Sequence, residues 1–453
     1  MAHWGNALRT FLTSAAGLVA LAAVAIAIGV FAASSGPTMG VAVAAGVLLI
    51  GIAATDLTLI PTLAVPATLV MLRVGGALSV SDVVLAGATF VSLLLIRAKD
   101  VRPMQPLLWA GAVYLATAIP VQVLHPYTAN IVEWVHEVVL VLGSMIVGFA
   151  IGRVGKARMS LSIYLLACSF IGVWAAVVAV LGFARTGVFE AVYLPELHKN
   201  TIGGMLAIAA VIAFARPVWL EWSRRNAYVV LIICFIGMAA AQSRQGLVGA
   251  VVGMLFIALR PRPQSGKRTK WIWPASIPVG VVVIQQVIEQ LESDNQFNSA
   301  YQRLTWFETT LDIWRESPVF GVGLRWWYTD RFEEQFQPPN AEFEVLSSVG
   351  VVGLAGFLAM FAVALWFLIR MDPVYGTVGA AVVMARFVQA QFDLYWVAGQ
   401  ASLLWIVAGI CYGVQARDKA LGVEREAPKR FMSIDYALGR DAARQPVSAR
   451  SAN

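Results

Sequence analysis

The hydrophobic and polar positions of this chain are grouped in long blocks. Apolar runs of roughly 18 residues or more recur along the sequence, and each is long enough to cross a bilayer as a helix. This pattern predicts an all-α, polytopic integral membrane protein with about 12 to 14 transmembrane helices. The predicted spans are 11–33, 38–55, 58–76, 81–97, 105–123, 132–152, 159–184, 200–216, 226–242, 245–260, 271–289, 344–370, 374–390 and 396–415.

The span at 58–76 differs from the others, because Pro61, Pro66 and Arg73 interrupt it. Proline removes a backbone donor and clashes with the preceding turn, so a continuous helix is disfavoured there. The sequence leaves a broken, a re-entrant and an interfacial helix as alternatives.

One long polar stretch, residues 290–343, separates two sets of apolar runs and is rich in Arg, Glu and Trp. We therefore divide the chain into transmembrane helices at 1–289, an extracytoplasmic loop at 290–343, further transmembrane helices at 344–415, and a polar tail at 416–453, which we expect to be disordered. The loop is the expected location of the chemistry, and its tryptophans are expected to anchor it at the membrane interface.

Composition supports this class, since 59% of the residues are hydrophobic and only 13% are charged. The net charge of +7 does not indicate nucleic-acid binding, because the basic residues lie in short interhelical loops and in the tail. Basic loops mark the cytoplasmic side of a membrane protein. They occur at 97–102, 153–158, 216–225 and 260–270. The loops between them, at 124–131, 185–199, 243–244 and 290–343, are then extracytoplasmic, and both termini are cytoplasmic.

Several kinds of chemistry are disfavoured by the motifs that the sequence lacks. The three cysteines lie in apolar runs and suit buried positions, and there is no metalloprotease motif or Gly-rich phosphate loop. We expect no metal and no cofactor, so the energy for a reaction would come from an activated substrate.

Arginine residues supply the first candidate site. Arg244 lies in a very short turn between two apolar helices, where a charge facing lipid costs several kcal/mol, so it is expected to face a cavity or a partner. Guanidinium groups bind phosphate oxygens in pairs, which suits a lipid-linked diphosphate at the membrane surface. We favour this role for Arg244 and for Arg303. Further arginines of the outer side are Arg315, Arg325, Arg331 and Arg386.

Some of these arginines also have a simpler interpretation. Arg386 lies inside an apolar run and could pair with Asp393 or with a carboxylate of the loop. Arg325 and Arg331 could be ordinary surface charges.

His198, Lys199 and Asn200 close an outer loop directly before an apolar run. Asn200 could simply cap the following helix. Alternatively, His198 and Lys199 lie at the mouth of the arginine-lined cavity, where the helix N-terminus also attracts anions.

Asn340, Glu342 and Glu344 lead into a Gly-rich apolar run. One glutamate could act as the general base for a sugar hydroxyl. Alternatively, Asn340 caps the helix and the glutamates complement its dipole. Because the glutamates are two positions apart, they point to different faces of a helix, and at most one is expected to face the site.

Four segments in order carry a resemblance to a known family. They are HKN, SRQG, YQRLTWFETTLDIWRESPVFGVGL and PPNAEFEVLSSVGVVGL, and they span roughly residues 195–365. This order resembles the O-antigen ligase and O-antigen polymerase superfamily, which includes exopolysaccharide polymerases. HKN is similar to the exopolysaccharide polymerase branch in particular.

The resemblance implies a metal-independent, inverting glycosyltransferase that takes a glycan from a polyprenyl-diphosphate carrier. By position, Arg244 and Arg303 match the arginines proposed to hold the diphosphate. The chain departs from the family where a His-Asn pair is common, since it has Pro339 and Asn340, and Ser348 stands where a Glu is common. Either another residue (Glu342, Glu344 or His198) replaces the histidine, or the reaction depends mainly on stabilising the charge of the leaving diphosphate, or the protein has a different function.

We therefore predict an O-antigen ligase-like glycosyltransferase of the bacterial cytoplasmic membrane, active on its extracytoplasmic side. Its partners would be a polyprenyl-diphosphate-linked glycan, a glycan or lipid-glycan acceptor, and the bilayer. The predicted catalytic residues are Arg244, Arg303 and Glu342, and the substrate-binding residues are His198, Lys199, Arg325, Asn340 and Arg386. A chain polymerase, a transporter or flippase of lipid-linked sugars, and an inactive scaffold are the alternatives. Gly321 and Gly323 are predicted to permit a turn within the loop.

Overall fold

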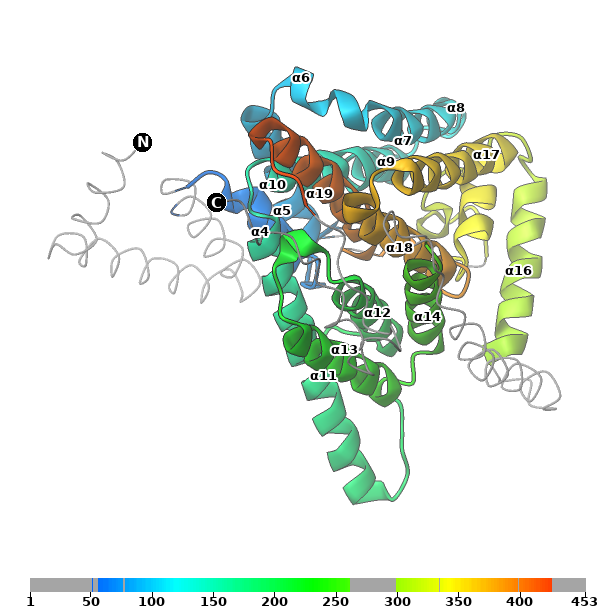
Figure 1. The fold of residues 1–453 in the computed structure, drawn as a ribbon. Coiled ribbons are helices and arrows are strands. Elements are labelled where there is room, and N and C mark those ends of the chain that lie inside the picture. The colour runs from blue at the N-terminus through cyan, green and yellow to red at the C-terminus, as the bar shows by residue number, and fades with distance from the viewer. Residues whose placement is uncertain are drawn as a thin grey trace, which may run out of the picture.

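A computed structural model describes residues 51, 56–75, 78–260, 299–333, 335–397 and 399–425. This part of the chain is almost entirely helical, as the apolar pattern predicts (Figure 1). The predicted spans 11–33, 38–55 and 271–289 lie outside the described residues, apart from residue 51. The predicted count of 12 to 14 spans, which rests on run length, therefore stays a prediction.

Within the described residues, four helical stretches are long and apolar enough to cross a membrane: Ala98–Leu124, Thr128–Arg153, Ala157–Thr186 and Ala341–Arg370. Shorter apolar helices accompany them. The α-helices in chain order are α4 Leu59–Ala67, α5 Val80–Leu95, α6 Ala98–Val101, α7 Gln105–Thr117, α8 Ile119–Leu124, α9 Thr128–Val138, α10 Ser144–Arg153, α11 Ala157–Thr186, α12 Lys199–Ala215, α13 Arg224–Ala240, α14 Arg244–Leu259, α16 Ser299–Arg315, α17 Ala341–Arg370, α18 Pro373–Ala390 and α19 Gln400–Leu421.

The interrupted span at 58–76 is broken, as one of the alternatives predicted. Only α4 is helical, and its interior contains Pro66. The chain then forms a two-stranded antiparallel hairpin from β1 (Arg73–Gly75) and β2 (Leu78–Ser79). Ser79 also caps α5 in a capping box with Asp82, so the hairpin leads directly into the next apolar helix.

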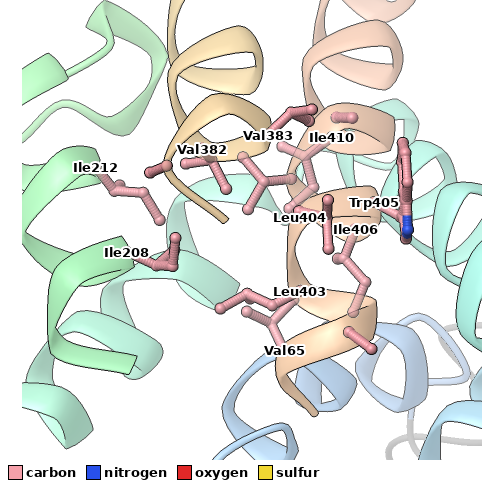
Figure 2. Close-up of a cluster of buried hydrophobic side chains, with 14 of the residues drawn as sticks. Val65, Ile208, Ile212, Val382, Val383, Leu403, Leu404, Trp405, Ile406 and Ile410 are labelled. Atoms are coloured by element: carbon pink, nitrogen blue, oxygen red, sulfur yellow. The ribbon is translucent and has the colours of Figure 1, made fainter. Parts of the chain in front are cut away.

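The core lies where α12, α18 and α19 meet. Figure 2 shows aliphatic side chains from these helices and from α4 pointing into one shared interior. Most residues of α12 and α19 are buried, which explains why their apolar residues follow no single face. The start of α12 and the connection between α18 and α19 contribute to the wall of the cavity described below.

Helices α10 and α19 pack along a seam of glycines at a spacing of four residues. Gly148 and Gly152 of α10 face Gly409 and Gly413 of α19. A Cβ atom added at any of the four would clash with backbone atoms of the other helix. Small residues at this spacing let membrane helices approach closely, where packing is the main attraction between them.

Helix α17 is broken at Gly350, whose φ of +69° is outside the helical region. The carbonyl groups of Ser347 and Ser348 are thereby released, and they accept hydrogen bonds from the N–H groups of Val322 and Gly323, at 2.9 Å each. An added Cβ at Gly321 or Gly350 would clash with backbone atoms across this contact, and one at Gly323 would clash with the side chain of Tyr127. Gly321 and Gly323 have φ values of +74° and +114°, which confirms the predicted turn.

The polar stretch 290–343 is more ordered than the word loop suggests. Helix α16 occupies its first described part. The segment after α16 packs with Ile313 of that helix in a small separate core, in which Val322, Trp326 and Trp327 are also buried. The Nε1 atom of Trp326 donates to Ser347 Oγ at 3.1 Å. The predicted interfacial role is therefore wrong for Trp326 and Trp327, because both side chains pack inside the protein.

Helix α19 continues to Leu421, beyond the predicted end of the membrane part at residue 415. Asp418 is buried and accepts hydrogen bonds from Tyr375 Oη at 3.0 Å and from Arg425 Nη2 at 3.1 Å. The hydrogen bond from Tyr375, a residue of α18, connects this polar end of α19 to α18. The rest of the predicted tail, from residue 426, lies outside the described residues.

The glycine seam generates a test of the fold. We expect Gly148→Ala to lower the free energy of unfolding by about 1–3 kcal/mol, because the added methyl group forces α10 away from α19. Thermal unfolding in detergent measures the effect. Gly182→Ala in α11 is the matched control, since nothing lies within 4 Å of its added Cβ and alanine favours a helix. Equal melting temperatures for the two variants would contradict the close seam.

Candidate functional site

A cavity of about 620 Å³ opens where several helix ends meet. Its walls come from the hairpin, the start of α5, α9, the start of α12, the segment after α16, and the connection between α18 and α19. The polar lining residues are Arg73, Ser79, His136, Glu196, His198, Thr201, Arg325, Gln337 and Asp393. The cavity is large enough for a drug-sized ligand, and its lining contains both basic and acidic side chains.

These walls share one feature of the sequence. The lining residues Glu196, His198, Arg325 and Gln337 belong to loops predicted to be extracytoplasmic, and the other segments lie at the ends of predicted spans on the same side. The structure brings these segments together around one cavity, which agrees with their assignment to the same side of the membrane. Which side of the membrane they occupy stays a prediction.

Arg325 is a buried basic residue of the cavity wall. Its side chain is buried with 7% of its surface exposed. Its Nη2 atom donates to Glu133 Oε1 at 3.0 Å, and its Nε atom lies 2.9 Å from Glu133 Oε2. Burial by itself lowers the pKa of Arg325, but the charge of Glu133 outweighs that effect and raises the pKa. The guanidinium group is therefore a permanent cation in the cavity wall, and the interpretation of Arg325 as a surface charge is wrong.

A chain of charged side chains continues from Glu133 into the membrane helices. His136 Nδ1 lies 3.3 Å from Glu133 Oε2, and His136 Nε2 lies 3.2 Å from Asp82 Oδ1. Asp82 accepts hydrogen bonds from the N–H of Ser79 at 2.8 Å and from its hydroxyl at 2.7 Å. All of these groups are buried, and two of them, Ser79 and His136, line the cavity.

The two glutamates at the start of α17 point in different directions, as predicted. Glu344 accepts a hydrogen bond from Gln337 Nε2 at 2.8 Å and lines a small recess beside Arg325, together with Glu133 and Glu137. Glu342 instead accepts from Gln391 Nε2 at 2.6 Å. The structure therefore brings Glu344 closer to Arg325, whereas the sequence favours Glu342 as the base.

Asn340 is the N-cap of α17, and its Oδ1 atom accepts a hydrogen bond from the N–H of Phe343 at 3.0 Å. Its Nδ2 atom donates to the carbonyl of Gln391 at 3.1 Å. The capping interpretation is confirmed, and Asn340 is not among the cavity residues. Pro339 beside it is buried and does not line the cavity either.

His198 lies at the mouth of the cavity, as one of its two interpretations predicted. It is also the N-cap of α12, because its Nδ1 atom accepts a hydrogen bond from the N–H of Asn200 at 3.3 Å. The cap predicted for Asn200 is therefore supplied two residues earlier. Lys199 is the first residue of α12 and half-buried, and the cavity lining does not include it.

Asp393 also lines the cavity and lies in the connection between α18 and α19. Its Oδ2 atom accepts a hydrogen bond from Gln245 Nε2 at 2.7 Å. Arg386 does not pair with it within ion-pair distance, but donates to the carbonyls of Leu394 at 3.0 Å and Tyr395 at 2.7 Å. Arg386 is thus fully enclosed and supports the backbone that carries Asp393, rather than facing a substrate.

The remaining predicted arginines lie outside the described lining. Arg244 is the exposed first residue of α14 and directly precedes Gln245, so it lies beside the wall that contains Asp393. Arg303 lies in α16, and its side chain is outside the described part of the structure. Arg315 pairs with Asp312, and Arg331 pairs with Glu316 at the exposed surface.

Sequence reasoning missed Arg73, Asp82, Glu133 and His136. A signal for three of them was present, because Asp82, Glu133 and His136 lie within or at the start of predicted apolar spans, where charges are costly and mark functional sites. Arg73 was recognised only as an interruption of a helix. Its place in the lining depends on the hairpin, which no pattern of apolar residues predicts.

Comparison with known proteins gives the context for this geometry. Residues 229–358 match the family model described as O-antigen ligase. The matched segment contains α13, α14, α16 and the start of α17, and it includes Arg325 of the cavity wall. A search of curated proteins finds no match. This segment is therefore similar to the O-antigen ligase family, which supports the resemblance seen in the sequence.

Proposed function

We propose that this protein is a membrane glycosyltransferase of bacterial cell-envelope polysaccharide assembly. It would transfer a glycan from a polyprenyl-diphosphate carrier to an acceptor hydroxyl on the outer face of the cytoplasmic membrane. The observation that carries the proposal is the cavity of about 620 Å³, whose lining combines cationic groups with an oriented carboxylate. The family match and the long apolar helices support the same conclusion.

The basic part of the cavity suits the diphosphate of the donor. Arg73 and Arg325 both line it, and guanidinium groups bind phosphate oxygens through paired hydrogen bonds. His198 and the N-terminus of α12 add donors at the mouth, because the first N–H groups of a helix attract anions. Arg244 remains a candidate ligand at the edge of the cavity. Arg303 remains one on the strength of the sequence alone.

The acidic part suits the acceptor. Asp393 is half-buried and oriented by Gln245. No ion pair joins Asp393 to a basic side chain among the described residues. Its carboxylate is therefore available to accept a proton. We assign it, rather than Glu342, as the general base, because both carboxylates accept a hydrogen bond from a glutamine but only Asp393 lines the cavity.

The proposed reaction is a single displacement with inversion. The acceptor oxygen forms a bond to the anomeric carbon while its proton passes to Asp393. The bond between that carbon and the diphosphate oxygen breaks, and the polyprenyl diphosphate leaves with both electrons. Arg73 and Arg325 stabilise the negative charge that develops on this leaving group.

Transfer by the purified protein in liposomes tests the proposal, with a polyprenyl-diphosphate oligosaccharide as the donor. Lipid-linked products of increasing length would identify a polymerase, and transfer to a different acceptor would identify a ligase. Movement of the intact carrier across the bilayer without transfer would contradict the proposal in favour of a transporter.

We expect Asp393→Asn to reduce transfer about 10²- to 10⁴-fold, because an amide keeps the hydrogen bond from Gln245 but cannot accept the proton. The rate of product formation in liposomes measures this loss. Glu196→Gln is the matched control, since Glu196 is an exposed carboxylate of the same lining. If Asp393→Asn is active and Glu342→Gln is not, the base is Glu342.

We also expect Arg73→Gln to raise the KM for the donor. Loss of a charge-assisted hydrogen bond costs about 1.5–3 kcal/mol, which corresponds to roughly a 10- to 150-fold change. Arg331→Gln is the control, because Arg331 pairs with Glu316 away from the lining. Measuring Arg244→Gln in the same series decides whether Arg244 also contacts the diphosphate. An unchanged KM for Arg73→Gln would exclude Arg73 from that site.

A further inference from the structure

The chain of charges behind Arg325 has no assigned role in the proposed reaction, although it occupies two membrane helices. It consists of Glu133 and His136 on α9 and Asp82 on α5. The side chains of the three residues are at most 5% exposed. A buried charge costs several kcal/mol unless it is paired, so such a group persists only where a partner compensates it.

Each member of this network is held by its neighbours. Glu133 uses one carboxylate oxygen for Nη2 of Arg325, and its other oxygen faces both Nε of Arg325 and Nδ1 of His136. The second ring nitrogen of His136 faces Asp82, which is fixed by Ser79. An imidazole donates from both nitrogens only in its charged form, so a carboxylate on each side favours the cation.

The charges of the four side chains then balance. Arg325 and His136 contribute two cations, and Glu133 and Asp82 contribute two carboxylates. With both of its ring nitrogens facing carboxylates, His136 has no free position to act as a base, although it lines the cavity. The arrangement suits a rigid support better than a proton acceptor.

The network also determines where Arg325 points. Arg325 has a left-handed backbone conformation with φ of +57°, which a residue other than glycine adopts only under constraint. The preceding residue, Leu324, is tied to α9 as well, because its N–H donates to Asn130 Oδ1 at 2.9 Å. Helix α9 therefore fixes both the backbone and the guanidinium group at this point of the cavity wall.

We propose that Glu133, His136 and Asp82 are positioning residues, which hold the Arg325 guanidinium against the diphosphate of the donor. This inference rests on the proposed function, since it gives Arg325 a diphosphate ligand. It means that the membrane helices α5 and α9, rather than the polar segment alone, set the geometry of the donor site. The matched family segment, residues 229–358, contains Arg325 but none of its three supports.

The test uses the full-length protein in liposomes and two readouts. We expect Glu133→Gln to lower kcat/KM for transfer roughly 10- to 100-fold, because a misplaced binding group loses catalytic geometry. We also expect it to weaken the binding of polyprenyl diphosphate without sugar. Glu133→Asp keeps the charge and is expected to retain more of both functions. It also provides a variant that is expected to fold if the amide does not.

Asp418→Asn is the matched control, because it breaks a buried ion pair of the same kind at the other end of α19, away from the cavity. We expect it to lower the melting temperature as much as Glu133→Gln while leaving diphosphate binding unchanged. If both variants lose binding only in proportion to their lost stability, the network is merely structural and the inference is wrong.

The two proposals fail in different ways. If the wild type transfers no glycan but Glu133→Gln still weakens diphosphate binding, the proposed transferase function is wrong and the positioning role stands. If the wild type transfers glycan and Glu133→Gln binds and reacts as well as the wild type, only the positioning role is wrong.

Discussion

A buried ion pair between Arg325 and Glu133 connects the polar segment after α16 to the membrane helix α9. The low polarity of the interior makes this contact decisive, because either charge alone would be costly there. Pairing them fixes the segment against the bundle at one place. The docking of Val322 and Gly323 on the broken end of α17 fixes it at a second place. Two attachments of different chemistry thus turn a polar connection into a cavity wall.

The cost of burying an unpaired polar group also explains how the connection between α18 and α19 is held. Arg386 is enclosed within α18, and its guanidinium donates to the carbonyls of Leu394 and Tyr395 rather than to a carboxylate. Backbone carbonyls of an irregular segment need donors when water is excluded, and a buried arginine supplies two. This leaves Asp393 without a buried cationic partner among the described side chains, so its carboxylate faces the cavity instead of a structural ion pair.

The fold was predictable to the extent that bilayer crossing depends on the length of apolar runs. Helices α12, α13 and α14 begin and end within two residues of their predicted spans. The end of α19 was missed because Asp418 looks polar in sequence but is buried with Tyr375. The hairpin that carries Arg73 was missed because its two strands are only 3 and 2 residues long and show no alternation of apolar and polar residues. Such short-range structure depends on tertiary contacts that apolar periodicity does not contain.

The candidate site was predictable only in part, because residue type indicates what a group can bind but not which way it faces. His198 and Arg325 were proposed from sequence and do line the cavity, whereas Lys199, Asn340 and Arg386 do not. Glu342 and Glu344 are the same residue type two positions apart, so their sequence gives no reason to prefer one of them. The direction in which each side chain leaves α17 decides that Glu344 lies beside Arg325. Glu133 lies nearly two hundred residues from Arg325, a separation that no local motif spans.

Pro339 and Asn340 stand where the resembled family commonly has a His-Asn pair, and the structure shows what surrounds this position. Asn340 caps α17 and donates to the carbonyl of Gln391, while the side chain of Gln391 donates to Glu342. The start of α17 is therefore tied to the connection that carries Asp393, only two residues further along. A proton acceptor on that connection can serve the same region as a histidine at position 339 would. The base of the proposed reaction, Asp393, therefore lies on the connection beside the cap of α17, and the hydrogen bond from Asn340 to Gln391 holds that connection against the helix.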